Sequence, residues 1–296
     1  MNGARAVGDR PHPMSGMDTF SPREIAELVE TRGVTKARAP AVTTFVLGVV
    51  AGAFIALGGV LSTIIGTGSE LGFGPTRFLS GIGFSLGLIL VIVAGAELFT
   101  GNNLIAMSWV SGHIPLGRLL QNWAIVYVGN LIGALSVVAM VYLGQWWSQA
   151  DDAVGATALT TAVTKAGLPF GAVLMRGILA NALVCLAVWL ASGGRSVIDK
   201  IFAILFPISA FVASGFEHSI ANMYFLPLGI LLKDQAGVVR AAALPPSELA
   251  HLGVGSAAAN ILSATLGNIV GGAVLVGLVY WFVYLWSSRT DQHPNA

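Results

Sequence analysis

The sequence predicts an all-α membrane protein in which six transmembrane helices form an inverted repeat, with helices 2 and 5 broken. Three observations support this fold class. Hydrophobic residues make up 55% of the 296 residues and charged residues only 10%, whereas a soluble chain carries charge at about one residue in four. Six apolar stretches are long enough to cross a bilayer. One sequence motif with polar residues recurs inside two of these stretches.

The apolar stretches define the crossings, because roughly 20 apolar residues span the ~30 Å hydrocarbon core as a helix. In chain order they are Val42–Ile65, Phe78–Ala96, Leu119–Leu143, Phe170–Ala191, Ile201–Phe216 continuing through Asn222–Leu232, and Ser256–Leu285. The short segment Asn102–Val110 completes the second crossing as a half-helix. We therefore expect a channel domain at 41–287, an N-terminal segment at 1–40 and a C-terminal tail at 288–296.

Basic residues orient the chain in the membrane. Six crossings place both termini on one side, and most Lys and Arg residues near the span ends lie on that side. The positive-inside rule then makes the termini cytoplasmic. We expect a multi-pass protein of the bacterial plasma (inner) membrane.

A short amphipathic helix is predicted within the N-terminal segment. Ser21-Pro22-Arg23-Glu24 has the form of a capping box with proline at the first helical position. Ile25, Leu28 and Val29 follow at helical spacing. On the cytoplasmic surface this helix serves either as an interfacial anchor or as a gate over the pore, and the sequence leaves both open.

The recurring polar motif indicates an internal repeat. Gly95–Asn102 and Gly215–Asn222 share the pattern G-x-E-x-x-x-x-N. Two further matches keep the same order: Gly48-x-x-Ala51-x-Ala53 with Gly177-x-x-Ala180-x-Ala182, and Gly129–Gly133 with Gly267–Gly271. Because each half has three crossings, the second half inserts upside down and the two breaks meet near the midplane. The matched glycines of the third and sixth spans are interpreted as sites of close helix packing.

Ionisable groups at membrane depth are functional candidates, because lipid makes them costly. Of the five histidines, His218 is the one at membrane depth, directly at the second break. An imidazole exchanges protons near neutral pH, whereas a single imidazole cannot hold a haem or a metal ion. The alternative is a core histidine tied to Glu217 or to a carbonyl. Thr100 lies at the first break, so its hydroxyl either faces the imidazole or bonds to its own helix.

The remaining polar residues near the breaks have structural or pore-lining interpretations. Glu97 and Glu217 are expected to accept backbone N–H groups freed by each break, because a bare carboxylate in the path would repel an anion. The same interpretation applies to Asn102 and Asn222.

Two further asparagines, Asn181 and Asn268, interrupt apolar helices and are candidate pore-lining donors. Lys165, in the loop before the fourth span, either draws anions to the outer mouth or is an ordinary solvated charge. Four apolar side chains near the polar centre are either ordinary core or hydrophobic constrictions: Phe84, Leu88, Leu98 and Phe211.

At these residues the sequence resembles the formate/nitrite transporter family, from about Ser21 to Trp286. The segments that carry the resemblance are Ala96–Thr100, Gly177–Asn181, Gly193–Ser196 and Gly215–Met223. The resemblance implies an aquaporin-like fold and a homopentamer with one pore per protomer. It implies pore residues at Thr100, Lys165, Asn181, His218 and Asn268, constrictions at Phe84, Leu88, Leu98 and Phe211, and a mobile gate at about Ser21–Ala39.

Within that family, Phe225–Ile230 after the histidine motif resembles the formate subgroup. Arg176 is unexpected there and leaves nitrite and hydrosulfide as alternative substrates. We predict a channel-like transporter of small monovalent anions, formate first, coupled to protonation at His218. It is expected to be no enzyme and to need no cofactor or metal. Its partners are the anion, the proton, membrane lipid and further copies of the chain.

Other function classes fit less well. A membrane redox subunit would need a second intramembrane histidine or a cysteine cluster, and Cys185 is the single cysteine. The net charge of +1, without a basic patch, argues against nucleic acid as a partner. A channel for neutral solutes is the remaining alternative, and ion-dependent currents would separate it from an anion transporter.

Overall fold

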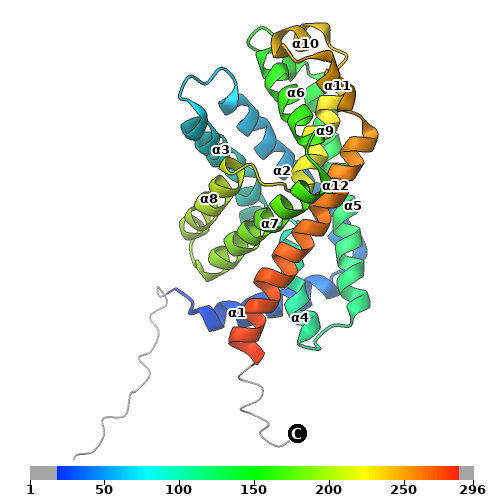
Figure 1. Cartoon of the computed structure of the whole chain (residues 1–296). Coiled ribbons are helices and arrows are strands. Elements are labelled where there is room, and N and C mark those ends of the chain that lie inside the picture. The colour runs from blue at the N-terminus through cyan, green and yellow to red at the C-terminus, as the bar shows by residue number, and fades with distance from the viewer. Residues whose placement is uncertain (1–18, 287–296) are drawn as a thin grey trace, which may run out of the picture.

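The computed structural model describes residues 19–286, and the expected crossings are present in it (Figure 1). Within that range, five helical segments are long and apolar enough to cross a membrane: α2 (Ala41–Gly66), α3 (Phe73–Ala94), α5 (Leu116–Leu143), α7 (Phe170–Gly193) and the run Val254–Trp286. Each overlaps a predicted span. The remaining crossing is divided between α8 (Val197–Ala213) and α9 (Ser219–Leu232).

The last crossing is one continuous helical run of mixed geometry. It begins as α12 (Val254–Ile269), widens into the π-helix η3 (Val270–Leu278) and ends with α13 (Val279–Trp281) and η4 (Phe282–Trp286). The π-helical turns press the backbone at Gly272 against α7, where an added Cβ would lie 2.8 Å from the Cys185 sulfur. Glycine is therefore required at this contact.

Both predicted helix breaks are present. α3 ends at Ala94, and the chain resumes as the 3₁₀ helix η1 (Gly101–Ile105) followed by α4 (Ala106–Val110). The second break separates α8 from α9. Gly95 and Gly215 open the two breaks with φ of 86° and 69°. This left-handed conformation favours glycine, which explains why both motifs begin with it.

The predicted N-terminal helix is α1 (Pro22–Arg38), and its capping box is confirmed. The Glu24 amide donates to the Ser21 hydroxyl, and the Ser21 amide donates back to the Glu24 carboxylate at 2.7 Å. Ile25, Ala26 and Val29 pack into a cluster that includes Leu285 at the end of the last crossing. The start of α1 and the end of that crossing therefore lie at one end of the molecule, as an even number of crossings requires (Figure 1).

The structure corrects one expectation, because a helix stands where a loop was expected. α6 (Ala153–Ala166) precedes the fourth crossing, and Lys165 lies in its last turn rather than in a loop. Its 14 residues are too few to span a bilayer. One face packs against α9, but its frequent threonines make this apolar face difficult to recognise in the sequence. α6 lies at the end of the molecule opposite α1, with α10 (Ala236–Ala242) and α11 (Pro246–His251) (Figure 1).

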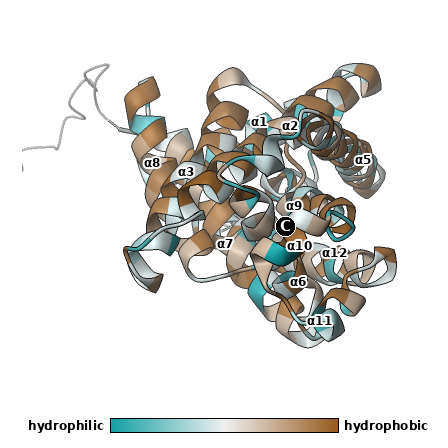
Figure 2. Cartoon of the chain, turned by 90° about the horizontal axis from the view of Figure 1, so that it is seen from above, coloured by the Kyte–Doolittle hydropathy of each residue, from teal (hydrophilic) through white to brown (hydrophobic). Residues whose placement is uncertain are grey.

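The two halves pack in the same way. α2 contacts α3 and α5, α7 contacts α8 and α12, and α3 of the first half contacts α8 of the second. An added Cβ at Gly129 would lie 2.8 Å from the Phe45 carbonyl oxygen, so the glycine interpretation as a packing contact is confirmed there. Seen from above, the ribbons of α3, α5 and α8 are coloured mainly as apolar (Figure 2). Phe202 and Phe206 of α8 are among the exposed apolar side chains.

Candidate transport site

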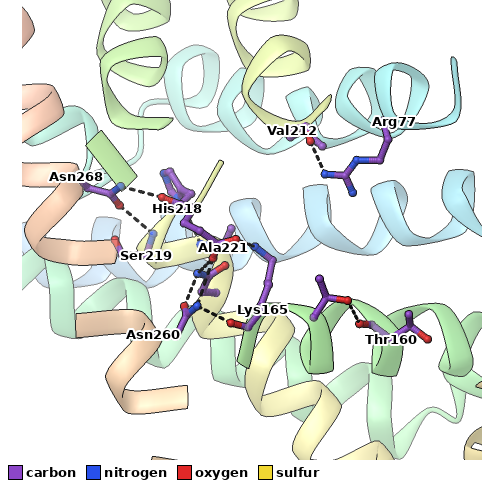
Figure 3. A network of polar contacts seen from close by, with 12 residues as sticks. Arg77, Thr160, Lys165, Val212, His218, Ser219, Ala221, Asn260 and Asn268 are labelled. Carbon is purple, nitrogen blue, oxygen red and sulfur yellow. Dashed lines mark hydrogen bonds and ion pairs between the residues drawn. The ribbon is translucent and has the colours of Figure 1, made fainter. Parts of the chain in front are cut away.

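Thr100 and His218 meet at the centre, each held by its own helix break. The Thr100 Oγ1 and His218 Nε2 atoms lie 2.9 Å apart, and both side chains are buried. The Nδ1 atom of His218 accepts the Ala221 amide at 3.1 Å and so caps the N-terminus of α9 (Figure 3). A neutral ring that accepts at Nδ1 carries its proton on Nε2, so the imidazole donates to the Thr100 hydroxyl.

Apolar rings and aliphatic side chains surround this pair. Phe84 packs edge-on against Phe211 with 5.5 Å between ring centroids, and Phe211 lies 5.9 Å from the His218 ring. Leu88 and Leu98 are buried on the other side, next to α1. The four predicted constriction residues are therefore core residues by burial, and they also line two cavities, Leu88 and Leu98 the one and Phe84 and Phe211 the other.

One cavity opens at each end of the molecule. The first, which we call the α1-side cavity, has a volume of about 250 Å³ and ends at Leu88 and Leu98. The second, the α6-side cavity, has about 340 Å³ and reaches Phe84, Phe211 and His218. His218 lines the α6-side cavity, whereas Thr100 lines neither cavity.

Each break carries an ion pair between its glutamate and a lysine of a short helix. At the first break Lys36 Nζ lies 3.0 Å from the Glu97 carboxylate and 2.9 Å from the Asn102 oxygen. Asn102 in turn donates to Glu97 at 2.6 Å and to Asn122 at 2.9 Å. The Asn122 amide closes the network by donating to the Lys36 carbonyl oxygen at 3.2 Å.

The second break repeats this network with equivalent residues (Figure 3). Lys165 Nζ lies 2.9 Å from the Glu217 carboxylate. Asn222 donates to Glu217 and to Asn260, each at 2.7 Å. The Asn260 amide donates to the Lys165 carbonyl oxygen at 3.0 Å, so four interactions match those of the first break.

The role expected of the glutamates belongs to two other residues. At the first break Asn130 accepts the Phe99 amide at 2.9 Å and donates to the carbonyl oxygens of Gly48 and Glu97. At the second break Asn268 accepts the Ser219 amide at 2.9 Å and donates to the carbonyls of Gly177 and Glu217.

The glutamate side chains instead accept from lysine and asparagine side chains. A short amide side chain on a neighbouring helix can both donate to and accept from the freed backbone, whereas a carboxylate can only accept. The expectation that Glu97 and Glu217 receive backbone N–H groups was therefore wrong.

Asn181 and Asn268 bind the backbone near Thr100 and His218 and line neither cavity. The Asn181 amide donates to the carbonyl oxygens of Thr100 at 3.2 Å and Asn268 at 2.7 Å, and to the Asn103 side chain at 2.8 Å. Both asparagines are fully buried. They therefore fix the backbone on which Thr100 and His218 stand.

The buried Thr100–His218 pair lies at the breaks of two inverted helices, and one cavity opens toward each end of the molecule. This arrangement is that of a membrane channel or transporter. A family model described as formate/nitrite transporter matches residues 23–282. The chain belongs to this family. The family is one of channels and transporters, and the protein is a multi-pass membrane protein.

Individual relatives cover nearly the whole chain. The sequence is 43% identical to formate channel FocA of Escherichia coli (strain K12), over 93% of this chain and 98% of the relative. It is 36% identical to formate channel FocA of Haemophilus influenzae, over 88% and 93%. A solved pentameric formate channel with formate bound is 37% identical, covering 83% of this chain and 98% of its own, with a TM-score of 0.77. An ion channel of the same family gives a TM-score of 0.75 at 27% identity.

Proposed function

We propose that the protein is a homopentameric, channel-like transporter of formate in the bacterial inner membrane. The relatives named as formate channels and the pentameric structure with bound formate support the substrate and the assembly. The observation that carries the proposal is the buried Thr100–His218 pair between two apolar constrictions. In this proposal the α1-side cavity faces the cytoplasm, together with both termini.

The constrictions make protonation useful. Moving a bare anion past Phe84 and Leu98 removes its water without replacing it by opposite charge, which costs several kcal/mol. Formic acid is neutral and loses far less hydration. In the proposed mechanism an anion reaches the protonated His218 ring through the α6-side cavity, accepts a proton from it and crosses the narrow segment as the neutral acid. The acid loses the proton in the α1-side cavity, and the neutral ring takes up another proton from water in the α6-side cavity.

The α9 cap sets a condition on this step. An imidazolium carries protons on both nitrogens, so charging His218 breaks its bond from the Ala221 amide. Loss of such a cap costs about 0.5–2 kcal/mol. We propose that proton passage is accompanied by transient release of the α9 N-terminus, and that a nearby anion stabilises the charged ring during that time. Lys165, which lines the α6-side cavity, draws anions toward it.

A liposome uptake panel tests the proposal. Purified protein is reconstituted, and the initial uptake of formate, nitrite, hydrosulfide, lactate and acetate is measured at two pH values. We expect formate to be taken up fastest, with proton movement in step. Faster nitrite or hydrosulfide uptake would assign a different substrate within the family. Solute uptake without current or proton movement would point to a channel for neutral solutes.

A further inference from the structure

The α6-side cavity contains two arginines that the proposed proton step does not use. Arg77 comes from the first turn of α3 and Arg176 from α7, and both line this cavity with Lys165. They approach the same turn, residues 212–217, from different helices. The Arg77 guanidinium donates to the Val212 carbonyl at 2.6 Å (Figure 3), and the Arg176 carbonyl accepts the Glu217 amide at 3.4 Å.

Neither arginine forms a salt bridge with a carboxylate in the described part of the chain. Among residues 19–286, no acidic oxygen lies within ion-pair distance of Arg77 or Arg176. Glu217, the acidic residue that lines this cavity, is already bound by Lys165, Asn222 and Asn260. The Nε atom of Arg77 is buried without a hydrogen-bond partner in the described part of the chain. Arg77, Arg176 and Lys165 against the one carboxylate of Glu217 leave the cavity wall with a net positive charge.

Three of the threonines that line the same wall have their hydroxyl protons already engaged. Thr157, Thr161 and Thr164 of α6 each donate their hydroxyl proton to a carbonyl one turn earlier in the helix. Their oxygens therefore present lone pairs, which do not attract an anion. The full positive charges that can attract an anion in this cavity are those of the cationic side chains.

We propose that Arg77 and Arg176 form an anion-capture station in the α6-side cavity, separate from the Thr100–His218 pair and specific for small planar oxyanions such as carboxylates. A guanidinium offers two parallel N–H donors that match the two oxygens of a carboxylate, whereas a lysine ammonium offers a point charge. The station raises the local concentration of the anion before it reaches the apolar segment. This inference rests on the proposed function, because it assumes that an anion enters the cavity.

The test compares R176Q with R240Q. Arg240 lies on α10 at the same end of the molecule, exposed and outside the cavity, so R240Q makes the same change in charge without touching the station. Initial uptake of labelled formate is measured in intact cells and in inside-out vesicles, which present opposite ends of the molecule. We expect R176Q to raise KM by about three- to tenfold, up to about 1.4 kcal/mol, in one preparation only. The maximal rate and the R240Q values should match the wild type.

Several outcomes overturn the inference. An unchanged KM in R176Q, or an equal rise in both preparations, would mean that Arg176 does not act in the cavity. If R176Q does not accumulate in the membrane, R176K is used, because it keeps the charge and loses the planar fork; an unchanged KM in R176K then overturns the inference. If the wild type transports nitrite rather than formate, the substrate proposal fails while the same comparison with nitrite still decides the station.

Discussion

Lys36 and Lys165 occupy equivalent positions in the two halves of the molecule, each paired with the glutamate of its own helix break. Lys36 lies in the last turn of α1 and Lys165 in the last turn of α6. Each helix is followed by a proline, Pro40 or Pro169, at the start of a crossing. α1 is therefore the partner of α6 in the repeat. The repeating unit contains a short surface helix as well as its three crossings.

The two lysines differ in burial, and this difference predicts unequal effects of removing them. The Lys165–Glu217 side chains are 16% and 3% exposed, and those of Lys36–Glu97 are 34% and 13% exposed. Removing one partner of a buried ion pair costs about 3–5 kcal/mol, because the other charge stays buried and unpaired. Lys165→Met should lower the unfolding temperature of the detergent-solubilised protein more than Lys36→Met. Equal shifts would contradict this ordering.

Asn130 and Asn268 should be more important for stability than their size suggests. Removing either side chain leaves one amide and two carbonyl groups of a break without partners. Each unsatisfied buried group costs about 1–3 kcal/mol. Asn130→Ala and Asn268→Ala should both unfold well below the wild type in a thermal scan. Ser136→Ala, on the exposed side of α5, is the matched control and should be neutral. A neutral Asn130→Ala would show that water replaces the amide.

The sequence was sufficient to predict the crossings and the breaks for a physical reason. A helix that crosses lipid must be long and apolar, so a motif of polar residues within such a helix is easy to recognise in the sequence. The inverted repeat made the meeting of Thr100 with His218 one of two alternatives, and the 2.9 Å contact decides between them. These features depend on the pattern of hydrophobic residues, which can be seen in a single sequence.

The hydrogen-bonding partners were harder to predict, because they depend on how helices rotate against one another. Asn130 was missed although it is the repeat equivalent of Asn268, in the matched segments Gly129–Gly133 and Gly267–Gly271. Lys36 was missed although its spacing to Pro40 equals that of Lys165 to Pro169. Extending the repeat search to polar residues would have found both. Arg77 has no such signal, since its partner is a backbone carbonyl.

The constrictions predict a gain of permeability. If Leu98 and Phe211 exclude water from the path, Leu98→Ala and Phe211→Ala should admit anions that take up no proton. We expect larger currents and weaker discrimination among anions in planar bilayers. Leu159→Ala is the control, because Leu159 is equally buried but packs in the core away from both cavities. If all three variants lose stability without gaining conductance, the four predicted constriction residues serve only in packing.

Gly33 allows α1 to lie close to the first break, and this contact tests the gate. A Cβ at Gly33 would collide with the Ser108 hydroxyl, and Val29, Arg32 and Lys36 of α1 line the cavity below. Gly33→Leu should displace α1 and alter the pH dependence of formate flux in proteoliposomes. Gly117→Leu is the control, since nothing lies within 4 Å of an added Cβ there. Unchanged flux at every pH would make α1 an anchor.

His218→Asn tests the proton step with the least disturbance of the fold. An asparagine at the same place is a good N-cap, so its oxygen can replace Nδ1 in accepting the Ala221 amide and keep α9 intact. It cannot titrate, whereas an imidazole has an unperturbed pKa of about 6.5. The variant should assemble normally and pass anions without the proton movement that accompanies formate uptake.

The measurement combines labelled formate uptake with an internal pH dye in proteoliposomes. Thr100→Val is the companion variant, because it removes the partner of Nε2 and leaves the titratable ring in place. We expect it to slow uptake while keeping the proton-to-formate ratio. A wild-type ratio in His218→Asn would show that the proton travels by another route. His218 would then act as the cap of α9 and as a hydrogen-bond donor to Thr100, with no role as a proton carrier.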